Sequence, residues 1–132
     1  SGWAMSATGF KTMRDAFRDA EITSVDLSDT NSDFSALISI KDAARGNITS
    51  FAWPSNADFS SLDDATNFCV GSNKPMTTAQ YDNFLTRINA TNSNTGVTYS
   101  MGACTYTGGG AVATARAAIV AAGNTIIDGG AV

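Results

Sequence analysis

Two short blocks of sequence occur twice in this chain at nearly the same spacing. Residues 33–37 (DFSAL) return as residues 58–62 (DFSSL), and residues 22–25 (ITSV) return as residues 48–51 (ITSF). Self-similarity at a fixed period of roughly 20–50 residues is typical of repeat architectures, in which each unit buries its apolar face by stacking on its neighbour. The period therefore predicts a short solenoid within a chain of 132 residues.

Each repeat carries a pattern with apolar side chains at its first, fourth and sixth positions. The three copies are Ile22, Val25 and Leu27; Ile48, Phe51 and Trp53; and Ala65, Phe68 and Val70. In the second and third copies an asparagine follows three residues later, as in the strand of a leucine-rich repeat. We expect the last two apolar positions of each strand to point inward, so that Val25, Phe51 and Phe68 stack beneath Leu27, Trp53 and Val70.

A short helical pattern precedes each of these strands. Phe10, Met13 and Phe17 share one helical face before the first strand. Phe34, Leu37 and Ile38 begin a second such segment, and Phe59 and Leu62 a third, with Asp33 and Asp58 placed to cap them. The third unit is short, because the interval from Phe51 to Phe68 is clearly smaller than the interval from Val25 to Phe51.

Longer helices are predicted after the repeats. Thr77 and Gln80 form a capping box, and Tyr81, Phe84, Leu85 and Ile88 then form one face of a helix running to about Ala90. A second, alanine-rich helix is expected over residues 111–122, ended by Gly123.

Together these patterns predict an α/β fold. We expect a short leucine-rich-repeat-like solenoid with a parallel sheet of four or five short strands and helices on one side. The strands are expected near residues 22–27, 48–53, 66–70, 97–101 and 125–127 of one domain, residues 1–132. Residues 1–75 would form irregular leucine-rich repeats and residues 76–132 a C-terminal capping segment.

Composition argues against several classes of function. The net charge is -4 and the eight basic residues are scattered along the chain, so we expect no nucleic-acid partner. No stretch is apolar enough to suggest membrane insertion. The two cysteines, Cys69 and Cys104, leave both a disulfide and a pair of free thiols open, because two cysteines carry little spacing information.

Candidate chemical sites are weak. The chain contains no histidine, and Asp63 and Asp64 are adjacent, so they would not face each other as a catalytic dyad. Residues 29–33 (DTNSD) copy the start of a calcium loop but lack its glycine and its final glutamate, so a solvated turn is the preferred reading. The TGGGA segment lacks the strand and lysine of a phosphate loop. We therefore expect no enzyme activity, no cofactor and no metal.

Three segments resemble the BspA-type leucine-rich-repeat family of bacterial surface proteins, which phages also encode. They are residues 2–17 (GWAMSATGFKTMRDAF), residues 59–68 (FSSLDDATNF) and residues 76–130, the segment that looks like the family's C-terminal closing portion. The middle of the chain, residues 35–46, departs from the family pattern because it lacks the usual aromatic residue and cysteine. The resemblance implies an extracellular, cell-surface or virion location.

We expect a binding module, such as the tip of a bacterial surface or phage receptor-binding protein, that docks on a cell-surface protein or glycan. Its binding face would be the outward side of the sheet, with Ser24, Asp26, Ser50, Ala52, Asn67, Cys69, Thr98 and Ser100. The alternative is a structural subunit of a virion or fibre that associates through an open sheet edge. Gly2 and Trp3 match the end of a repeat strand, so we expect Trp3 at the edge of the core and the first repeat covered by an N-terminal extension or a partner chain.

Overall fold

A computed structural model describes residues 11–18, 21–29 and 34–132 of the chain. It is a mixed α/β fold with two helices and small parallel sheets. The elements, in chain order, are β1 (Ser24–Asp26), β2 (Ser50–Ala52), β3 (Ala65–Cys69), α1 (Thr78–Thr91), β4 (Thr98–Met101), β5 (Thr105–Tyr106), α2 (Ala111–Ala121), β6 (Thr125–Ile127) and β7 (Gly130–Ala131). The predicted positions of all five core strands, β1 to β4 and β6, are confirmed.

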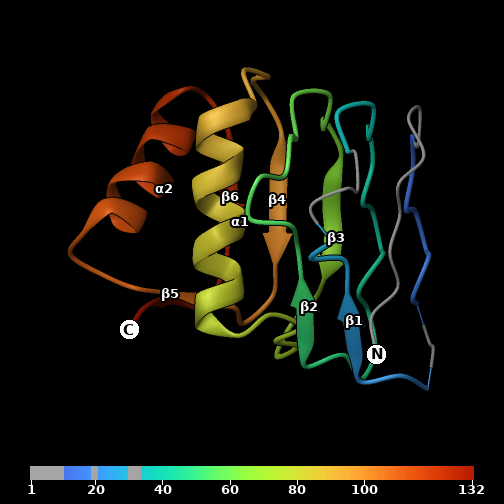
Figure 1. Ribbon diagram of the computed structural model, residues 1–132. Coiled ribbons are helices and arrows are strands. Elements are labelled where there is room, and N and C mark those ends of the chain that lie inside the picture. The colour runs from blue at the N-terminus through green and yellow to red at the C-terminus, as the bar shows by residue number, and fades with distance from the viewer. Residues whose placement is uncertain (1–10, 19–20, 30–33) are drawn as a thin grey trace.

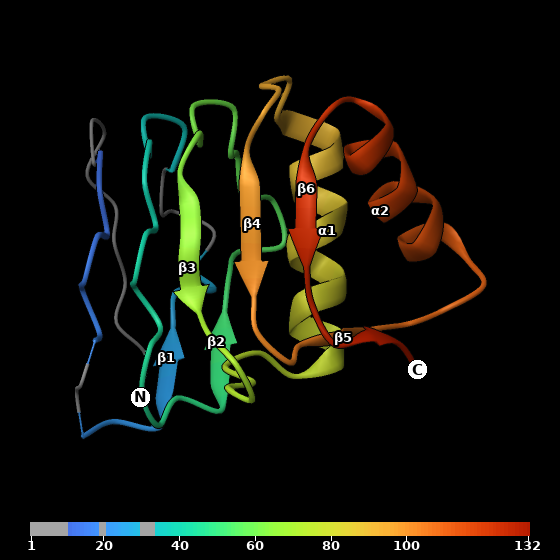
Figure 2. The same cartoon turned by 180° about the vertical axis from the view of Figure 1, so that it is seen from behind.

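The strands do not share one sheet, however. β1 pairs with β2, β4 lies between β3 and β6 in a second sheet, and β5 pairs with β7. Every one of these pairs is parallel, as predicted. The β1–β2 sheet and the three-stranded sheet lie on opposite sides of the molecule, with β1, β2 and α1 in one layer and β3, β4 and β6 in the other (Figures 1 and 2).

β3 lies outside the predicted sheet because it occupies a different position within the repeat from β1 and β2. Between Val25 and Phe51 the chain completes a full repeat and returns to the same layer, where these two residues pair. The shorter stretch from Phe51 to Phe68 is long enough to reach the opposite layer but not to return. The place beside β2 is taken instead by α1, whose Gln80 Oε1 accepts a hydrogen bond from the Phe51 backbone N–H at 3.0 Å.

The layer that contains β3 extends beyond its named strands. Residues 11–17 and residues 38–44 run parallel to β3 as two further segments, which we call the first and second rungs. Met13 N–H donates to the Ser39 carbonyl at 2.9 Å, and Ile40 N–H donates to the Asp64 carbonyl at 2.9 Å. The two rungs, β3, β4 and β6 together form what we call the ladder layer (Figure 2).

The short helices predicted before the strands are wrong among the described residues. Phe34 and Leu37 are joined by a single turn, in which the Leu37 N–H donates to the Phe34 carbonyl at 2.9 Å, and Phe59 and Leu62 form the same turn at 3.0 Å. Residues 14–18 also form turns rather than a helix. One turn is too short to stabilise a helix, and the chain must extend directly afterwards to reach the ladder layer.

Aromatic side chains from the two layers meet in the core. Phe51 and Trp53 are buried as predicted, and their rings lie 4.9 Å apart. Phe68 does not stack in the predicted row; its ring contacts Phe51 edge-on from the opposite layer, at 5.3 Å. Val70, expected in the same core, is only half-buried, because it follows the end of β3 at the rim of that layer.

The two predicted long helices are confirmed. Thr77 and Gln80 form the expected capping box at the start of α1, and Tyr81, Phe84, Leu85 and Ile88 are its buried face. α2 ends before Gly123, whose φ of 103° lies in the left-handed region that glycine adopts without strain. Both helices lie on the same side of the sheet that contains β3, β4 and β6 (Figure 2). In the part of the chain that is described, no helix is long and apolar enough to cross a membrane.

The C-terminal segment is tied to both helices through Asp128. Its carboxylate accepts hydrogen bonds from the Tyr81 hydroxyl at 2.7 Å and from the Arg116 Nε at 2.9 Å, and its side chain is only 2% exposed. The predictions for Trp3 and for the covering of the first repeat concern residues 1–10, which lie outside the described residues.

Candidate functional site

The eight residues predicted to form one binding face lie on two opposite faces. Ser24, Asp26, Ser50 and Ala52 belong to β1 and β2, whereas Asn67, Cys69, Thr98 and Ser100 belong to the ladder layer. The prediction of a single outward face is therefore wrong. The cause is that β3 is the continuation of the second rung in the next repeat, so it lies in the layer opposite β1 and β2.

The polar groups on β1 and β2 are mostly engaged in local structure. The Ser50 hydroxyl accepts a hydrogen bond from Gln80 Nε2 of α1 at 2.8 Å. Asp26 accepts hydrogen bonds from the hydroxyl and the backbone N–H of Ser28, and these bonds lower the pKa of its carboxyl below the usual value. Ala52 offers no polar group. This face is consequently the weaker candidate for ligand recognition.

The ladder layer, by contrast, has a hollow on its surface. The hollow has a volume of about 230 Å³ and is lined by Asn67, Cys69, Val70, Gly71, Ser100, Gly102 and Ile127. Three of the four predicted ladder-layer residues line it, and Thr98 lies at the start of the neighbouring strand β4. The structure thus brings together Asn67, Cys69 and Ser100 but separates them from the four residues of β1 and β2.

A local irregularity in β3 shapes this hollow. The register between β3 and β4 shifts between Ala65 and Cys69, and Asn67 has a φ of 54°. Asparagine and aspartate tolerate this left-handed conformation better than most residues. The extra residue breaks the alternation of side chains, so Cys69, predicted to face outward, is buried with 1% exposure.

Ser100 and Ile127 determine which kinds of contact the hollow can make with a ligand. Ser100, expected on an open sheet face, is only 8% exposed and lies in the lining of the hollow. Ile127, opposite Ser100 in the paired strand β6, is 54% exposed. A hydroxyl group, the Asn67 amide and an aliphatic side chain therefore surround the same space. The hollow can offer hydrogen bonds on one side and apolar contact on the other.

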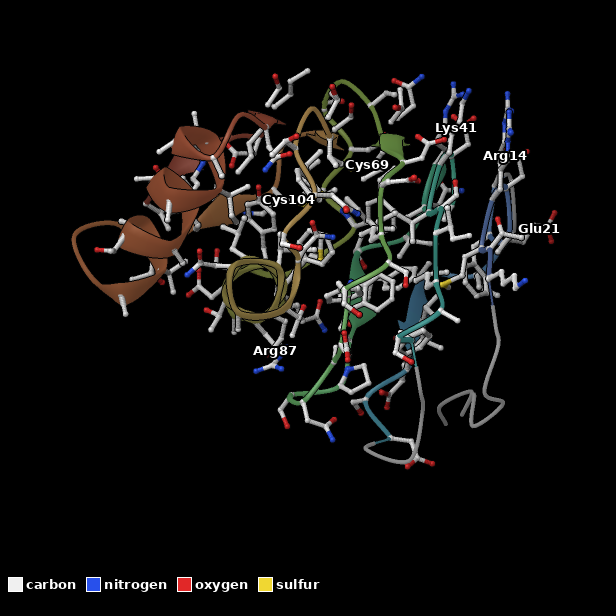
Figure 3. All side chains as sticks on the ribbon, turned by 90° about the horizontal axis from the view of Figure 1, so that it is seen from above. Arg14, Glu21, Lys41, Cys69, Arg87 and Cys104 are labelled. Atoms are coloured by element: carbon white, nitrogen blue, oxygen red, sulfur yellow. The ribbon has the colours of Figure 1, made fainter. Side chains whose placement is uncertain are left out.

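Cys69 and Cys104 are both buried and neither is in a disulfide. The neighbouring thiol of Cys104 and burial raise the pKa of Cys69, while the neighbouring thiol of Cys69 lowers the pKa of Cys104. Cys69 pairs with Met101 of β4, and the Met101 carbonyl accepts the Cys104 N–H at 3.1 Å, so the two cysteines belong to adjacent segments. Figure 3 labels both residues, on β3 and on the segment that follows β4. The sequence could not establish this proximity, because the whole of α1 and β4 separates the two cysteines along the chain.

The basic residues are less scattered than their sequence positions suggest. Five of the eight, Lys11, Arg14, Arg18, Lys41 and Arg45, lie in or next to the first two rungs. Arg14 and Lys41 project from neighbouring segments in the same direction (Figure 3). Two acidic residues lie among them: Asp15 pairs with Arg18 at 3.4 Å, and Asp42 pairs with Arg45 at 3.1 Å. This part of the surface therefore carries both positive and negative charge. The sequence alone does not reveal that these basic residues lie close together, because Arg14 and Lys41 belong to different repeats.

The structure adds no support for the other candidate chemical sites considered from the sequence. Asp63 and Asp64 do not form a facing pair; the Asp64 carboxylate accepts the Thr66 N–H at 3.2 Å. Within residues 11–18, 21–29 and 34–132, no group of three or more acidic or cysteine side chains could hold a metal ion. Residues 30–33 of the calcium-like loop lie outside the described residues. The glycines of the TGGGA turn lead into α2, whose N-cap Gly110 has no side-chain cap.

Sequence reasoning missed four residues that line the hollow, namely Val70, Gly71, Gly102 and Ile127. Ile127 could have been identified, because it is an apolar residue in a predicted strand whose neighbour Ile126 fills the inward position. Comparison with known proteins adds no candidate: no family model, curated protein or solved structure shows significant similarity to the chain.

Proposed function

We propose that this chain is a non-catalytic binding module of a bacterial surface or phage receptor-binding protein, and that the hollow in the ladder layer holds part of its ligand. The hollow is the observation that carries the proposal. It combines the Ser100 hydroxyl and the Asn67 amide with the exposed aliphatic side chain of Ile127. Binding sites for small groups are typically concave and apolar, with a few polar groups that fix orientation.

A glycan suits this hollow better than a peptide. A sugar ring presents hydroxyl groups at its edge, which match Ser100 and Asn67, and a face of C–H groups, which matches Ile127. A protein ligand would be expected to use a large aromatic or arginine anchor on one side. The hollow, at about 230 Å³, has room for only a small group. The proposed ligand is therefore a cell-surface glycan of which one residue enters the hollow.

The fold is consistent with a leucine-rich-repeat-like solenoid. Val25 pairs with Phe51 at the predicted spacing, and the first two rungs and β3 repeat on the opposite layer. Left-handed residues recur at equivalent places, with Asp15 and Asp42 at φ 58° and Asn67 at φ 54°. These observations support the resemblance to BspA-type proteins, and with it an extracellular, cell-surface or virion location. Repeat arrays commonly bind through such extended faces.

A blocking substitution tests this proposal. Ile127→Arg places a long charged side chain at the hollow without disturbing the core, since Ile127 is 54% exposed. We expect it to weaken binding of the fluorescently labelled protein to its host cells by about tenfold or more, the effect of about 1.4 kcal/mol. Ser24→Arg on β1 is the matched control, because it adds the same group on the opposite face.

The outcomes separate the possibilities. Binding that is lost after the cell surface is treated with periodate, which oxidises sugars, supports a glycan ligand. Binding that survives periodate and is lost after protease treatment points to a protein ligand instead. Equal binding by wild type and Ile127→Arg would show that the hollow is not the binding site. Loss of binding in Ser24→Arg alone would assign recognition to β1 and β2.

The alternative is a structural subunit of a virion or fibre. It is favoured by β6, which pairs only with β4 among the described residues and exposes Ile127, as an open sheet edge would. Sedimentation across a hundredfold range of protein concentration distinguishes the two functions. Assembly that grows with concentration and is reduced by Ile127→Arg supports the structural role, whereas a monomer throughout excludes it.

A further inference from the structure

The buried cysteine pair is the feature of this structure that neither the fold nor the proposed function explains. Cys69 lies at the end of β3, where its backbone pairs with Met101 of β4. Met101 begins a tight turn, in which its carbonyl accepts the Cys104 N–H at 3.1 Å. The turn therefore brings Cys104 back beside the strand that pairs with Cys69, and both side chains are almost completely buried.

The Cys69 thiol is packed tightly against this turn. It approaches the Ser100 carbonyl at 4.0 Å, and a Cβ atom added at Gly102 would lie only 2.9 Å from its sulfur. Gly102 has a φ of 56°, so a glycine here allows both the turn and the close approach of the thiol. Cys69 is also one of the residues that line the hollow, which gives a small reagent a route to it.

We propose that Cys69 and Cys104 form a dithiol–disulfide site, oxidised by exchange with a low-molecular-weight disulfide such as oxidised glutathione. In the first step the Cys69 thiolate attacks one glutathione sulfur, a mixed disulfide forms and one glutathione thiolate leaves. In the second step the Cys104 thiolate attacks the Cys69 sulfur and releases the second glutathione. The two cysteines lose two protons and two electrons, and the oxidised glutathione gains them as two thiols.

Access determines this order of events, because Cys69 lines the hollow and Cys104 is not part of that lining. The Cys104 thiol and burial raise the pKa of Cys69, so the first attack is the slower step and becomes faster as the pH rises. The neighbouring Cys69 thiol lowers the pKa of Cys104, which favours the thiolate that resolves the mixed disulfide. The product would join β3 to the segment after β4 and close a loop across α1, which constrains the unfolded chain.

The test uses the wild-type protein, so it needs no variant to fold. The reduced protein is incubated with oxidised glutathione, and its mass, free thiols and thermal midpoint are measured. We expect both thiols to disappear together, the mass to fall by two hydrogen atoms, and the midpoint to rise by about 10 °C. Trypsin cleavage after Arg87 separates the two cysteines, so their peptides stay linked only through a disulfide.

Three results would overturn the inference: persistent glutathione adducts, disulfide-linked dimers, or thiols that react only after urea has unfolded the chain. Cys104→Ser is the matched variant, because it retains Cys69 but removes the resolving thiol. It should accumulate one glutathione on Cys69 and show no rise in the thermal midpoint. The readouts do not depend on any ligand, so they stand apart from the proposed binding function.

Discussion

Replacing Asp128 by alanine removes the polar centre that joins both helices to the C-terminal segment. The carboxylate accepts hydrogen bonds from Arg116 through Nε at 2.9 Å and Nη2 at 3.0 Å, from the Tyr81 hydroxyl at 2.7 Å, and from the Gly130 N–H at 3.0 Å. Arg116 also lies over the Tyr106 ring, 5.0 Å from its centre. The substitution therefore leaves three donor residues without an acceptor.

The cost can be worked out for the two side-chain donors, Tyr81 and Arg116. Tyr81 is completely buried, so a hydroxyl without a partner costs about 1–3 kcal/mol. The side chain of Arg116 is 24% exposed and can return to water, so the lost ion pair adds at most about 1 kcal/mol. We therefore expect Asp128→Ala to lower the free energy of unfolding by about 1–4 kcal/mol, whereas breaking a fully buried ion pair costs roughly 3–5 kcal/mol.

Urea unfolding at pH 7, followed by tryptophan fluorescence, measures this cost. Asp82→Ala is the matched control, since the Asp82 carboxylate also accepts two hydrogen bonds, from Thr107, but at the surface. It should cost about 1 kcal/mol or less. If Asp128→Ala cost no more than Asp82→Ala, the reasoning from burial of the Tyr81 hydroxyl would be refuted.

The same site predicts a pH dependence. Burial alone would raise the pKa of Asp128, but hydrogen bonds from Arg116, Tyr81 and Gly130 outweigh it and hold the pKa below the usual value. A lowered pKa in the folded state stabilises the protein above the unfolded pKa of about 4, and this contribution is lost as the pH falls through the folded value. The difference in unfolding free energy between wild type and Asp128→Asn should be constant above about pH 5 and should shrink below about pH 4.

Two further substitutions test the core and the turn beneath the cysteines. Phe51→Ala removes a buried ring that contacts Trp53 and Phe68, so it should lower the free energy of unfolding in urea by about 3–5 kcal/mol. Ile22→Ala is the control; its side chain is 41% exposed, so it should lower the same free energy by less than about 1 kcal/mol. Gly102→Ala should cost more than Gly109→Ala, because both have positive φ but only a Cβ at Gly102 would lie 2.4 Å from a backbone oxygen. Equal costs within either pair would contradict the packing described.

The position of each element was predictable because its signals are local. The capping box at Thr77 and Gln80 starts α1, and Gly123 ends α2, through contacts within a few residues. The pairing of Val25 with Phe51 was also predictable, because the two lie in successive copies of the same sequence pattern. The rungs were not recognised, because the spacing of Met13 and Phe17 fits a helical face as well as an extended segment.

The sequence similarity between residues 33–37 and 58–62 did indicate how the second rung aligns with β3. It aligns Ile40 with Ala65 and Ala44 with Cys69, the inward residues of the second rung and of β3. The hydrogen bonds from Ile40 N–H to Asp64 and from Ala44 N–H to Phe68 show that this alignment is structural. The apolar pattern at Phe68 resembled that of Phe51 closely enough to suggest the wrong layer.

The sequence by itself determined the α/β class, the five core strands, the two helices and most of the buried side chains, since hydrophobic period and caps act over one or two turns of chain. Only the tertiary structure decided which strands share a sheet, because each repeat has one apolar segment in each layer and the two segments carry similar sequence patterns. It also decided the candidate site. The left-handed residue Asn67 turns Cys69 inward, and the path of the chain after β4 then places Cys104 beside Cys69 and forms the hollow lined by Ser100.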